Sequence, residues 1–329
     1  MSFEDSAATP DGEINTEIDG LGLAKLRTLV DARLEDFFRD QADMSRLGCA
    51  VRHGLLSPGK RLRPLITLLA CRQSAGPLAA AKGAPCLDAA CAVEMVHAAS
   101  LIMDDLPSMD DARLRRGALT THVVFGEGSA MLAAIALLNE AFRVLTNIPG
   151  VDAEARIRAM GHLTRAIGVE GLAGGQDQDI ACNNSLPSRS ASTQLPHHDA
   201  ALQEMEQRHL EKTGVLFAAA AAIGGEIAGA PPESIEELWN YGSTLGLAYQ
   251  AFDDVIDVIC DEETSGKDAA QDQDKSTVVS LLGEDGARVL AERHLARAIA
   301  SADAASITGT APLADLARMV GHKFGAMTA

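Results

Sequence analysis

Apolar residues recur at helical spacing along almost the whole chain of 329 residues, and few of them are aromatic. In the first such segment they stand at positions 23, 26, 30, 34, 37 and 38, the interval that places side chains on one face of a helix. Similar segments follow at about 61–75, 86–105, 128–146, 152–173, 199–223, 233–260 and 286–303. Only the run 122–125 looks like a strand, without an alternating series around it. The pattern predicts an all-α fold, a single-domain bundle of many helices.

The composition agrees with helices and excludes two classes of partner. Hydrophobic residues make up 47% of the chain and aromatic residues only 3%, so aliphatic side chains and methionine must fill the core. Strands are richer in aromatic and β-branched residues. Lys plus Arg number 28 against 46 Asp plus Glu, a net charge of −18. Nucleic acids and anionic membranes are bound through basic surfaces, so neither is expected as a partner.

Other features predict the organisation and location of the protein. Residues 1–20 are acidic and contain Gly and Pro, which predicts a mobile N-terminal segment. Residues 21–329 are expected to form one domain, with a surface loop rich in Ser, Asn and Pro at 183–198. We see no signal peptide and no apolar run of the ~20 residues that a membrane span needs. Six cysteines without metal-ligand spacing predict reduced thiols in a cytoplasmic, soluble protein.

A first acidic cluster directly follows an apolar helical segment. It contains Asp104, Asp105, Asp110 and Asp111 within eight residues. In a straight helix Asp104 and Asp110 would diverge by about 120°, but Pro107 breaks the helix and lets the segment wrap over its end. Clustered carboxylates need a cation, and a set of oxygen ligands suits Mg²⁺. The alternative is a solvated acidic turn.

Arginines stand directly behind these acids, at Arg113, Arg115 and Arg116. Acids followed by arginines are expected where a phosphate group is bound through both a metal ion and guanidinium groups. The alternative is a set of surface ion pairs, which contribute little.

A second acidic cluster lies inside an apolar helical segment. Asp253 and Asp257 are four residues apart on one helix face, Asp254 is adjacent, and Gln250 lies one turn before Asp254. Apolar residues flank the cluster on both sides, so a solvated face does not explain it. A row of carboxylates that faces the interior needs a cation. Two such clusters on facing helices could hold several Mg²⁺ ions that bind a polyanion.

Basic residues gather near these clusters although the chain is acidic. Residues 59–64 read Gly-Lys-Arg-Leu-Arg-Pro at an expected junction of loop and helix, where anions bind readily. Lys212 and Thr213 follow a helical segment, and Lys267 and Lys275 come after the second acidic cluster. Each alone is typical of a surface residue. Together they indicate two anion sites, one with metal and one without.

These motifs together resemble the polyprenyl (trans-isoprenyl) diphosphate synthases. The resemblance runs from about residue 59 to 282 and rests on GKRLRP, EMVH, DDLPSMD with RRG, KTG, FDDVID and GKDAAQDQDKST, in the expected order. The segments HAASLIMDDLPSMDDARLRRG and TSGKDAAQDQDKST look most like the bacterial geranylgeranyl diphosphate synthases of carotenoid pathways. The resemblance implies an all-α isoprenoid-synthase bundle around a central cavity, and a homodimer.

The resemblance also implies residue roles and a cofactor, about three Mg²⁺ ions per active site. Mg²⁺ on the allylic diphosphate would be held by Asp104, Asp105 and Asp110, with Asp253, Asp254 and Asp257 completing the set. Groups around that diphosphate would be Arg115, Lys212, Thr213, Gln250, Lys267 and Lys275. The diphosphate of isopentenyl diphosphate, which takes no metal, would be bound by Lys60, Arg63, His97 and Arg116.

The implied reaction is condensation of isopentenyl diphosphate with dimethylallyl, geranyl or farnesyl diphosphate. Cations stabilise the departing diphosphate, and the double bond of isopentenyl diphosphate attacks the allylic carbocation. In the family the fifth residue before the first Asp sets the floor of the product cavity. Here Ala99 stands at that position and Ser100 follows, and both are small. We therefore expect a product of twenty carbons, geranylgeranyl diphosphate.

Several alternatives remain open from the sequence. A farnesyl diphosphate synthase or a longer-chain synthase would share every motif above. A terpene cyclase shares ionisation by Mg²⁺, but it does not need a second diphosphate site such as GKRLRP with His97. A non-catalytic subunit of a heteromeric synthase would be expected to lack one Asp motif, and both are present.

Overall fold

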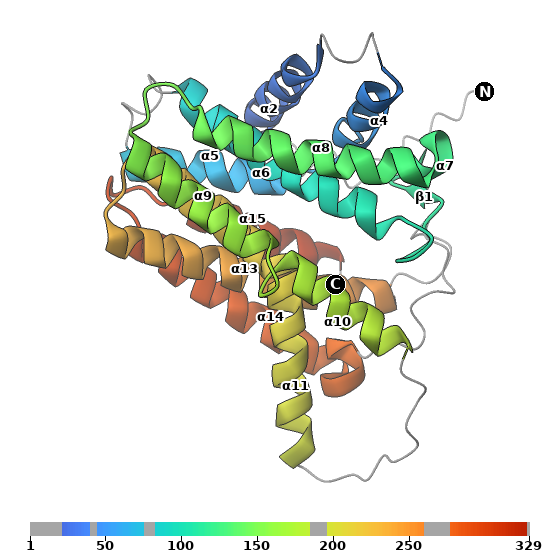
Figure 1. Cartoon of the computed structure of the whole chain (residues 1–329). Helices are drawn as coiled ribbons and strands as arrows, with labels where there is room; N and C mark the ends of the chain where they lie inside the picture. Colours follow the sequence, from blue (N-terminus) through green and yellow to red (C-terminus); the bar gives the residue numbers. More distant parts are fainter. Residues whose placement is uncertain (1–21, 40–44, 76–82, 185–195, 260–276, 328–329) are drawn as a thin grey trace, which may run out of the picture.

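The structure is a computed structural model that describes residues 22–39, 45–75, 83–184, 196–259 and 277–327. The described residues form a helical bundle with one short hairpin, which confirms the predicted fold class (Figure 1). The elements are α2 (Leu23–Phe37), α4 (Arg46–Leu55), α5 (Leu62–Ala75), α6 (Gly83–Asp104), β1 (Leu114–Arg115), β2 (Ala118–Leu119), α7 (Thr121–Phe125), α8 (Glu127–Thr146), α9 (Ala153–Ile167), α10 (Leu172–Asn184), α11 (Pro196–His209), η2 (Leu210–Gly214), α12 (Val215–Ala228), α13 (Pro232–Ile259), α14 (Val278–Ala304) and α15 (Pro312–Met327).

Helix α12 is the central element of the core. Its sequence is apolar on all sides, and every residue from Val215 to Ile227 is buried, as expected for a helix surrounded by others. It packs against α5, α6, α9 and α13. The small residues of this interface allow close approach: a Cβ on Gly224 would lie 2.4 Å from the Thr67 carbonyl oxygen, and one on Gly242 would lie 2.3 Å from the Phe217 carbonyl oxygen.

Three local expectations were wrong. Residues 121–125 form the short helix α7, because they continue directly into α8 and have no partner strand among the described residues. The segment 152–173 is divided into α9 and α10 at Gly168, which has an extended backbone. The segment 199–223 contains a π-helical turn, η2, between α11 and α12.

The predicted loop at 183–198 is shorter than expected among the described residues. Helix α10 continues to Asn184, and α11 begins at Pro196, where proline fits the first turn of a helix. Residues 185–195 of the predicted loop and the N-terminal segment 1–20 lie outside the described residues.

The cysteines also differ from the expectation of reduced thiols. Cys71 of α5 and Cys86 of α6 form a disulfide. Their spacing of 15 residues in the sequence carries no signal that would predict the pairing. Cys91 is a buried free thiol, and Cys49 is exposed.

Two helices, α6 and α8, are long and apolar enough to cross a membrane by length and composition. For α6, 72% of the apolar window is buried inside the bundle, whereas for α8 only 44% is buried. The core location of α6 accounts for its composition. Helix α8 instead presents apolar side chains to the outside, with Met131, Leu132 and Ile135 between 41% and 61% exposed.

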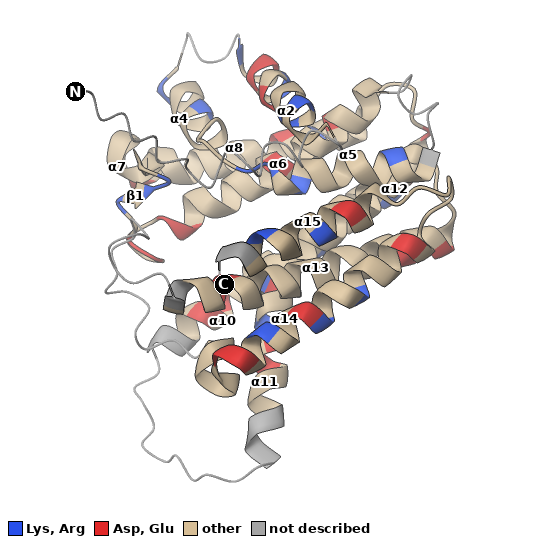
Figure 2. Ribbon diagram, turned by 180° about the vertical axis from the view of Figure 1, so that it is seen from behind, with Lys and Arg blue, Asp and Glu red and all other residues tan. Residues whose placement is uncertain are grey.

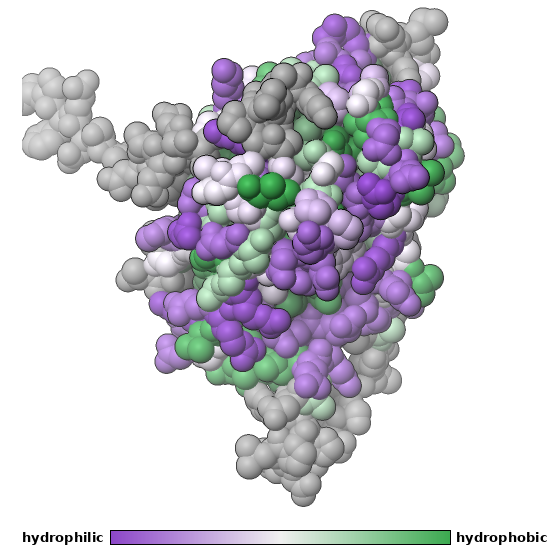
Figure 3. All heavy atoms as spheres, turned by 90° about the vertical axis from the view of Figure 1, so that its left-hand side faces the viewer, coloured by the Kyte–Doolittle hydropathy of each residue, from purple (hydrophilic) through white to green (hydrophobic). Residues whose placement is uncertain are grey.

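The face at the left of Figure 1 carries a mixture of polar and apolar side chains. Figure 3 shows hydrophilic and hydrophobic side chains interspersed over it. Charged residues are spread over most of the helices, and some of them lie where the turn after α6 and the β1–β2 hairpin come together (Figure 2).

Candidate active site

The first acidic cluster lies at the C-terminal end of α6. The helix ends at Asp104, and the chain then turns back so that the Asp110 amide donates to the Asp104 carbonyl oxygen at 2.9 Å. The Asp111 amide donates to the Leu106 carbonyl oxygen at 3.1 Å, which closes the turn around Pro107. The expectation that the motif wraps over a helix end is therefore confirmed.

Burial and crowding make this turn electrostatically unfavourable for carboxylates. Burial and, to a smaller extent, the neighbouring Asp110 raise the pKa of Asp104 to about 6, although Lys212 opposes the shift. Burial also raises the pKa of Asp105, against the effect of Arg115, whose Nε donates to Asp105 Oδ1 at 2.6 Å. Asp104 therefore resists ionisation until more positive charge comes near it.

Lys212 reaches the acidic cluster from the π-helical turn η2. Its Nζ forms an ion pair with Asp179 of α10. Burial opposes the charge of Lys212, but Asp179, Asp104 and Asp110 outweigh it and raise its pKa. Gly175 permits this contact, because a Cβ there would lie 2.8 Å from the Lys212 amide nitrogen. π-Turns inside helices are frequent at functional sites.

Asp179 is a residue of this region that the sequence analysis missed. It stands in the segment GGQDQD, where two acids and two glutamines next to a pair of glycines were the available signal.

The second acidic cluster lies near the end of α13, next to η2. Thr213 Oγ1 donates to Gln250 Oε1 at 3.1 Å, and Gln250 Nε2 lies 3.4 Å from Asp254 Oδ1. Asp254 Oδ2 accepts from the Val278 amide at 2.9 Å, which ties α13 to the start of α14. Asp253 stands beside it. The Asp257 side chain and the residues Lys267 and Lys275 lie outside the described part of the chain.

The donor chemistry of these acids fits Mg²⁺. The region supplies carboxylate oxygens, the ligands that Mg²⁺ prefers, and burial keeps the Asp104 carboxylate short of compensating charge. Among the described residues, however, no three acidic, histidine or cysteine side chains are close enough to hold a metal ion by themselves. The carboxylate of Asp105 is turned to Arg115 instead of to its neighbours. Bridging to a diphosphate would supply the remaining ligands, as Mg²⁺ commonly requires.

A second, cationic cavity lies between the loop before α5 and the side of α6. It is lined by Lys60, Arg61, Leu62, Arg63, Glu94, His97, Arg116, Thr213, Phe217 and Tyr249. Four predicted ligands of the metal-free diphosphate, Lys60, Arg63, His97 and Arg116, are brought together here.

Arg63 and His97 are in direct contact within this cavity. Arg63 Nη1 donates to His97 Nε2 at 3.1 Å, and the Arg63 guanidinium lies 4.6 Å from the centre of the Phe217 ring. Burial lowers the pKa of Arg63 to about 10. Burial and then the charge of Arg63 lower the pKa of His97 well below its usual value, so the imidazole is neutral. It can orient Arg63 but does not add a charge.

Arg116 lies along the loop before α5. Its Nη1 donates to the Pro58 carbonyl oxygen at 2.8 Å. Gly59 leaves the room for this contact, since a Cβ at that position would lie 2.4 Å from Arg116 Nη1. The glycine of the GKRLRP motif therefore has a steric role.

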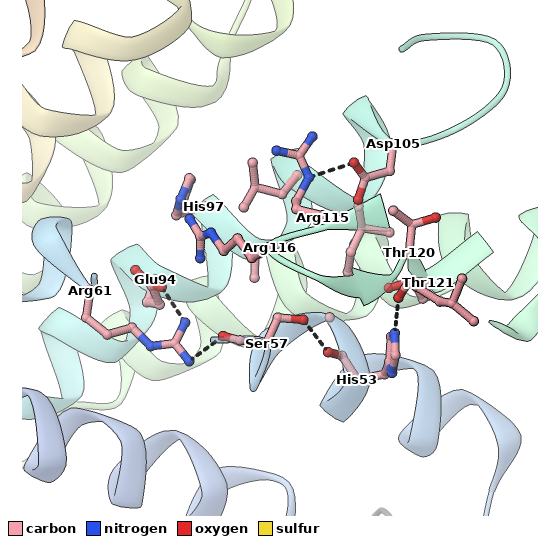
Figure 4. Close-up of a pocket in the computed structure, with 15 residues that line it drawn as sticks. His53, Ser57, Arg61, Glu94, His97, Asp105, Arg115, Arg116, Thr120 and Thr121 are labelled. Carbon is pink, nitrogen blue, oxygen red and sulfur yellow. Dashed lines mark hydrogen bonds and ion pairs between the residues drawn. The ribbon is translucent and has the colours of Figure 1, made fainter. Parts of the chain in front are cut away.

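Residues that are adjacent in the sequence point in different directions, one toward the acidic clusters and the other into the cationic cavity. Arg115 points to Asp105 while Arg116 points into the cationic cavity beside His97 (Figure 4). Similarly, Lys212 faces the acids and Thr213 lines the cationic cavity. We call the first set the aspartate region (Asp104, Asp105, Asp110, Arg115, Asp179, Lys212, Asp253, Asp254) and the second set the arginine region (Lys60, Arg61, Arg63, Glu94, His97, Arg116).

Backbone conformations at positive φ mark the same places. Arg61, Asp111 and Arg116 are the non-glycine residues with positive φ among those described, at 51°, 47° and 53°. Such a conformation costs an ordinary residue about 1–2 kcal/mol. Arg116 and Gly117 together form the tight turn of the β1–β2 hairpin, which requires positive φ at both central residues. The strain thus falls on the segments that aim the arginines.

Ala99 and Ser100 lie one turn or more before Asp104 on α6. Ala99 is 1% exposed and belongs to the core, and Ser100 donates to the His97 carbonyl oxygen at 2.9 Å. Both positions therefore lie on the helix that leads into the bundle from the aspartate region.

Comparison with known proteins places this arrangement among described families. Residues 45–304 match the sequence profile of the polyprenyl synthetase family. The chain is 40% identical over 266 residues to a geranylgeranyl diphosphate synthase of Pantoea ananas, a match that covers 81% of this chain and 82% of that protein. It is 43% identical over 248 residues to geranylgeranyl pyrophosphate synthase 12 of Arabidopsis thaliana, which covers 74% of this chain and 65% of that longer protein.

The fold is likewise similar to solved structures. The crystal structure of an FPP/GFPP synthase from Zymomonas mobilis superimposes with a TM-score of 0.75 at 29% sequence identity, covering 92% of this chain and 99% of that one.

Proposed function

The chain belongs to the polyprenyl synthetase family, and on this premise we propose that it condenses isopentenyl diphosphate with an allylic diphosphate to form geranylgeranyl diphosphate. The allylic substrates are dimethylallyl, geranyl and farnesyl diphosphate. Inorganic diphosphate leaves the allylic carbon, a carbon–carbon bond forms, and one proton is released.

One observation carries the proposal: two regions of different chemistry are joined by adjacent residues. Arg115 and Arg116 stand side by side in the hairpin and serve the aspartate and the arginine region respectively. A reaction between two diphosphate esters needs two anion sites at short distance, of which only one must activate its ester. A terpene cyclase would need only the aspartate region.

The aspartate region would hold the allylic diphosphate. Asp104, Asp105, Asp110, Asp253 and Asp254, with Asp257, are the residues that would hold Mg²⁺, and the ions would supply positive charge to the diphosphate as it departs. Arg115 and Lys212 donate hydrogen bonds to the same group. Because both cations are partly shielded from water, they stabilise the charge that develops on the leaving oxygen more than they would in solution.

The arginine region would hold isopentenyl diphosphate. Lys60, Arg63 and Arg116 supply charge without a metal ion, and neutral His97 orients Arg63. The rings of Phe217 and Tyr249, 5.9 Å apart, give this cavity an apolar wall that excludes water from the carbocation. The proton lost from the isopentenyl unit passes to the departing diphosphate.

An assay on the purified chain tests this function. We expect product of twenty carbons when the protein is incubated with Mg²⁺, farnesyl diphosphate and labelled isopentenyl diphosphate and the dephosphorylated products are separated by chromatography. A product that forms from farnesyl diphosphate alone would indicate a cyclase. The absence of any product from the purified chain would indicate a non-catalytic subunit.

Product length depends on the floor that Ala99 provides. A bulky ring at this buried position on α6 would fill space that the growing chain needs. Ala99→Phe is therefore expected to shift the product from twenty to fifteen carbons, whereas Ser100→Ala should leave it at twenty. A wild type that already stops at fifteen carbons, or an Ala99→Phe variant with unchanged products, would refute this assignment.

We also propose a cytoplasmic homodimer that supplies carotenoid synthesis. The exposed apolar side chains of α8, Met131, Leu132 and Ile135, support a second copy of the chain on this helix, since exposed apolar patches mark interfaces. Light scattering is expected to give twice the chain mass for the wild type and the mass of one chain for Ile135→Lys.

A further inference from the structure

Glu94 of α6 has a buried carboxylate, and only one of its two oxygens accepts a hydrogen bond among the described residues. Its side chain is 3% exposed, and Oε1 accepts from Arg61 Nη1 at 2.7 Å. Oε2 has no hydrogen-bond partner among the described residues, although it is buried. Burying an acceptor in this way costs about 1–3 kcal/mol, so the remaining charge must be compensated by its surroundings.

The side chains around Glu94 include the arginines proposed to bind the diphosphate. Glu94 lines the cationic cavity together with Arg63, His97 and Arg116, and it also lines the adjacent cavity between α4 and the hairpin. The Nε of Arg63 is a second buried polar atom without a partner among the described residues. Glu94 also raises the pKa of Arg116 against the larger opposite effect of burial. A buried acceptor and a buried donor without hydrogen-bond partners among the described residues, Glu94 Oε2 and Arg63 Nε, thus share one site.

Arg61 differs from its neighbours because the protein holds it through all three of its guanidinium nitrogens. Its Nε donates to Asp31 at 2.8 Å. Its Nη1 donates to Glu94 at 2.7 Å and its Nη2 to the Ser57 carbonyl oxygen at 3.0 Å (Figure 4). It is 7% exposed and has a φ of 51°. Three of its five N–H groups are thus engaged by the protein, which fixes the side chain in place. Its location in the motif therefore serves to hold Glu94.

We propose that Glu94 is a positioning residue of the isopentenyl diphosphate site: Arg61 fixes its carboxylate, and the negative charge of Glu94 holds the guanidinium groups of Arg63 and Arg116 in the cavity that they share, ready for the diphosphate. The inference rests on the proposed function and deepens it. Without this negative charge, Lys60, Arg61, Arg63 and Arg116 would repel one another and spread apart. With it, the guanidinium groups are held near each other before the substrate arrives.

The test compares Glu94→Gln with a matched control, Glu226→Gln. Glu226 is a buried glutamate of α12 whose side chain is 5% exposed and accepts from Arg158 and His162, outside both regions. Apparent KM values for isopentenyl and farnesyl diphosphate and kcat are measured for both variants. The wild type and Glu94→Asp, which keeps the charge, are measured alongside.

We expect Glu94→Gln to raise the KM for isopentenyl diphosphate at least tenfold, with the KM for farnesyl diphosphate and kcat within threefold of wild type. Glu94→Asp should lie between Glu94→Gln and wild type, and Glu226→Gln should leave both KM values unchanged even where it lowers Tm. If Glu94→Gln does not fold, Glu94→Asp is the test: a rise of the KM for isopentenyl diphosphate without a rise of the KM for farnesyl diphosphate would support the proposal.

Equal changes in both KM values, or a KM for isopentenyl diphosphate within twofold of wild type, would overturn the inference alone. A wild type that neither turns over nor binds isopentenyl diphosphate would overturn the proposed function, and the inference with it.

Discussion

The aspartate region and the arginine region lie side by side but are stabilised in opposite ways. In the arginine region the protein itself supplies counter-charge and hydrogen-bond acceptors: Asp31 and Glu94 pair with Arg61, which also donates to a carbonyl, and the neutral His97 accepts from Arg63. In the aspartate region, burial and the neighbouring Asp110 raise the pKa of Asp104 to about 6, and Lys212 only partly compensates. The arginine region is organised by the protein itself, whereas in the proposed function the aspartate region would be completed by metal ions.

This difference explains how an acidic chain can bind two diphosphates. The isopentenyl ester only needs to be held, so fixed cations in a rigid frame are sufficient. The allylic ester must ionise, and divalent ions provide more charge at the leaving oxygen than side chains could. The net charge of −18 is therefore compatible with anionic substrates, because in the proposed function local charge and metal ions would recruit them.

The largest effect on activity is expected from a substitution in the aspartate region. Asp104→Asn removes a carboxylate that would hold Mg²⁺, so we expect kcat to fall by about 10³-fold, the range seen when charge stabilisation of a transition state is lost. The KM for isopentenyl diphosphate should stay within threefold of wild type. Steady-state kinetics at saturating Mg²⁺ measures both values, and a kcat within tenfold of wild type would contradict the assignment.

A smaller effect is expected when the arginine region is altered. Arg63→Lys keeps the charge but loses the planar contact with Phe217 and the fixed contact with His97. We expect kcat/KM for isopentenyl diphosphate to fall by about 30-fold, and kcat/KM for farnesyl diphosphate by less than threefold when isopentenyl diphosphate is saturating. Arg165→Lys, which removes a similar contact with Trp239 away from the site, is the control.

The two regions should also differ in their effect on stability. The pKa of Asp104 is higher in the folded protein than in the unfolded chain, so the folded state loses stability as pH rises from about 4 through about 6. Asp104→Asn removes this cost. In EDTA at pH 8 we expect the variant to be about 1–2 kcal/mol more stable than wild type, after allowance for solvent screening.

Thermal unfolding at several pH values checks this expectation. The gain in Tm should shrink below pH 6, where the wild-type carboxyl becomes protonated in the folded state, and vanish below about pH 4, where it is protonated in both states. A variant that is less stable than wild type at pH 8 would show that Asp104 is already compensated by the protein.

The smallest effect concerns Asp111, which is exposed and has a φ of 47°. Glycine adopts this conformation without strain, so Asp111→Gly should leave kcat within twofold and raise the free energy of unfolding by about 0.5 kcal/mol. Urea denaturation and the standard assay measure the two quantities. A loss of activity above tenfold would place Asp111 among the groups that bind the substrate or its metal ions.

Sequence reasoning could predict the features that depend on local patterns. Helical spacing gave the long helices, and Pro107 indicated where α6 ends and the acidic turn begins. The GKRLRP and EMVH motifs located the residues that meet in the arginine region. These features are encoded within a few consecutive residues, so one segment at a time is sufficient to recognise them.

Features that depend on tertiary contacts could not be predicted in the same way. The pairing of Asp179 with Lys212 requires α10 and η2 to touch at Gly175. The pairing of Arg61 with Glu94 joins residues 33 positions apart, and the disulfide joins α5 to α6. A run such as 122–125 carries too little context to distinguish a short helix from a strand.

Binding of each substrate with and without metal tests the central claim most directly. Isothermal titration of the wild type would compare isopentenyl diphosphate and a non-hydrolysable farnesyl diphosphate analogue in Mg²⁺ and in EDTA. We predict that EDTA changes the Kd for isopentenyl diphosphate by less than threefold and weakens binding of the farnesyl analogue by at least 100-fold. Equal dependence of both ligands on Mg²⁺, or of neither, would contradict the division of the site into a region that the protein itself organises and a region that metal ions complete.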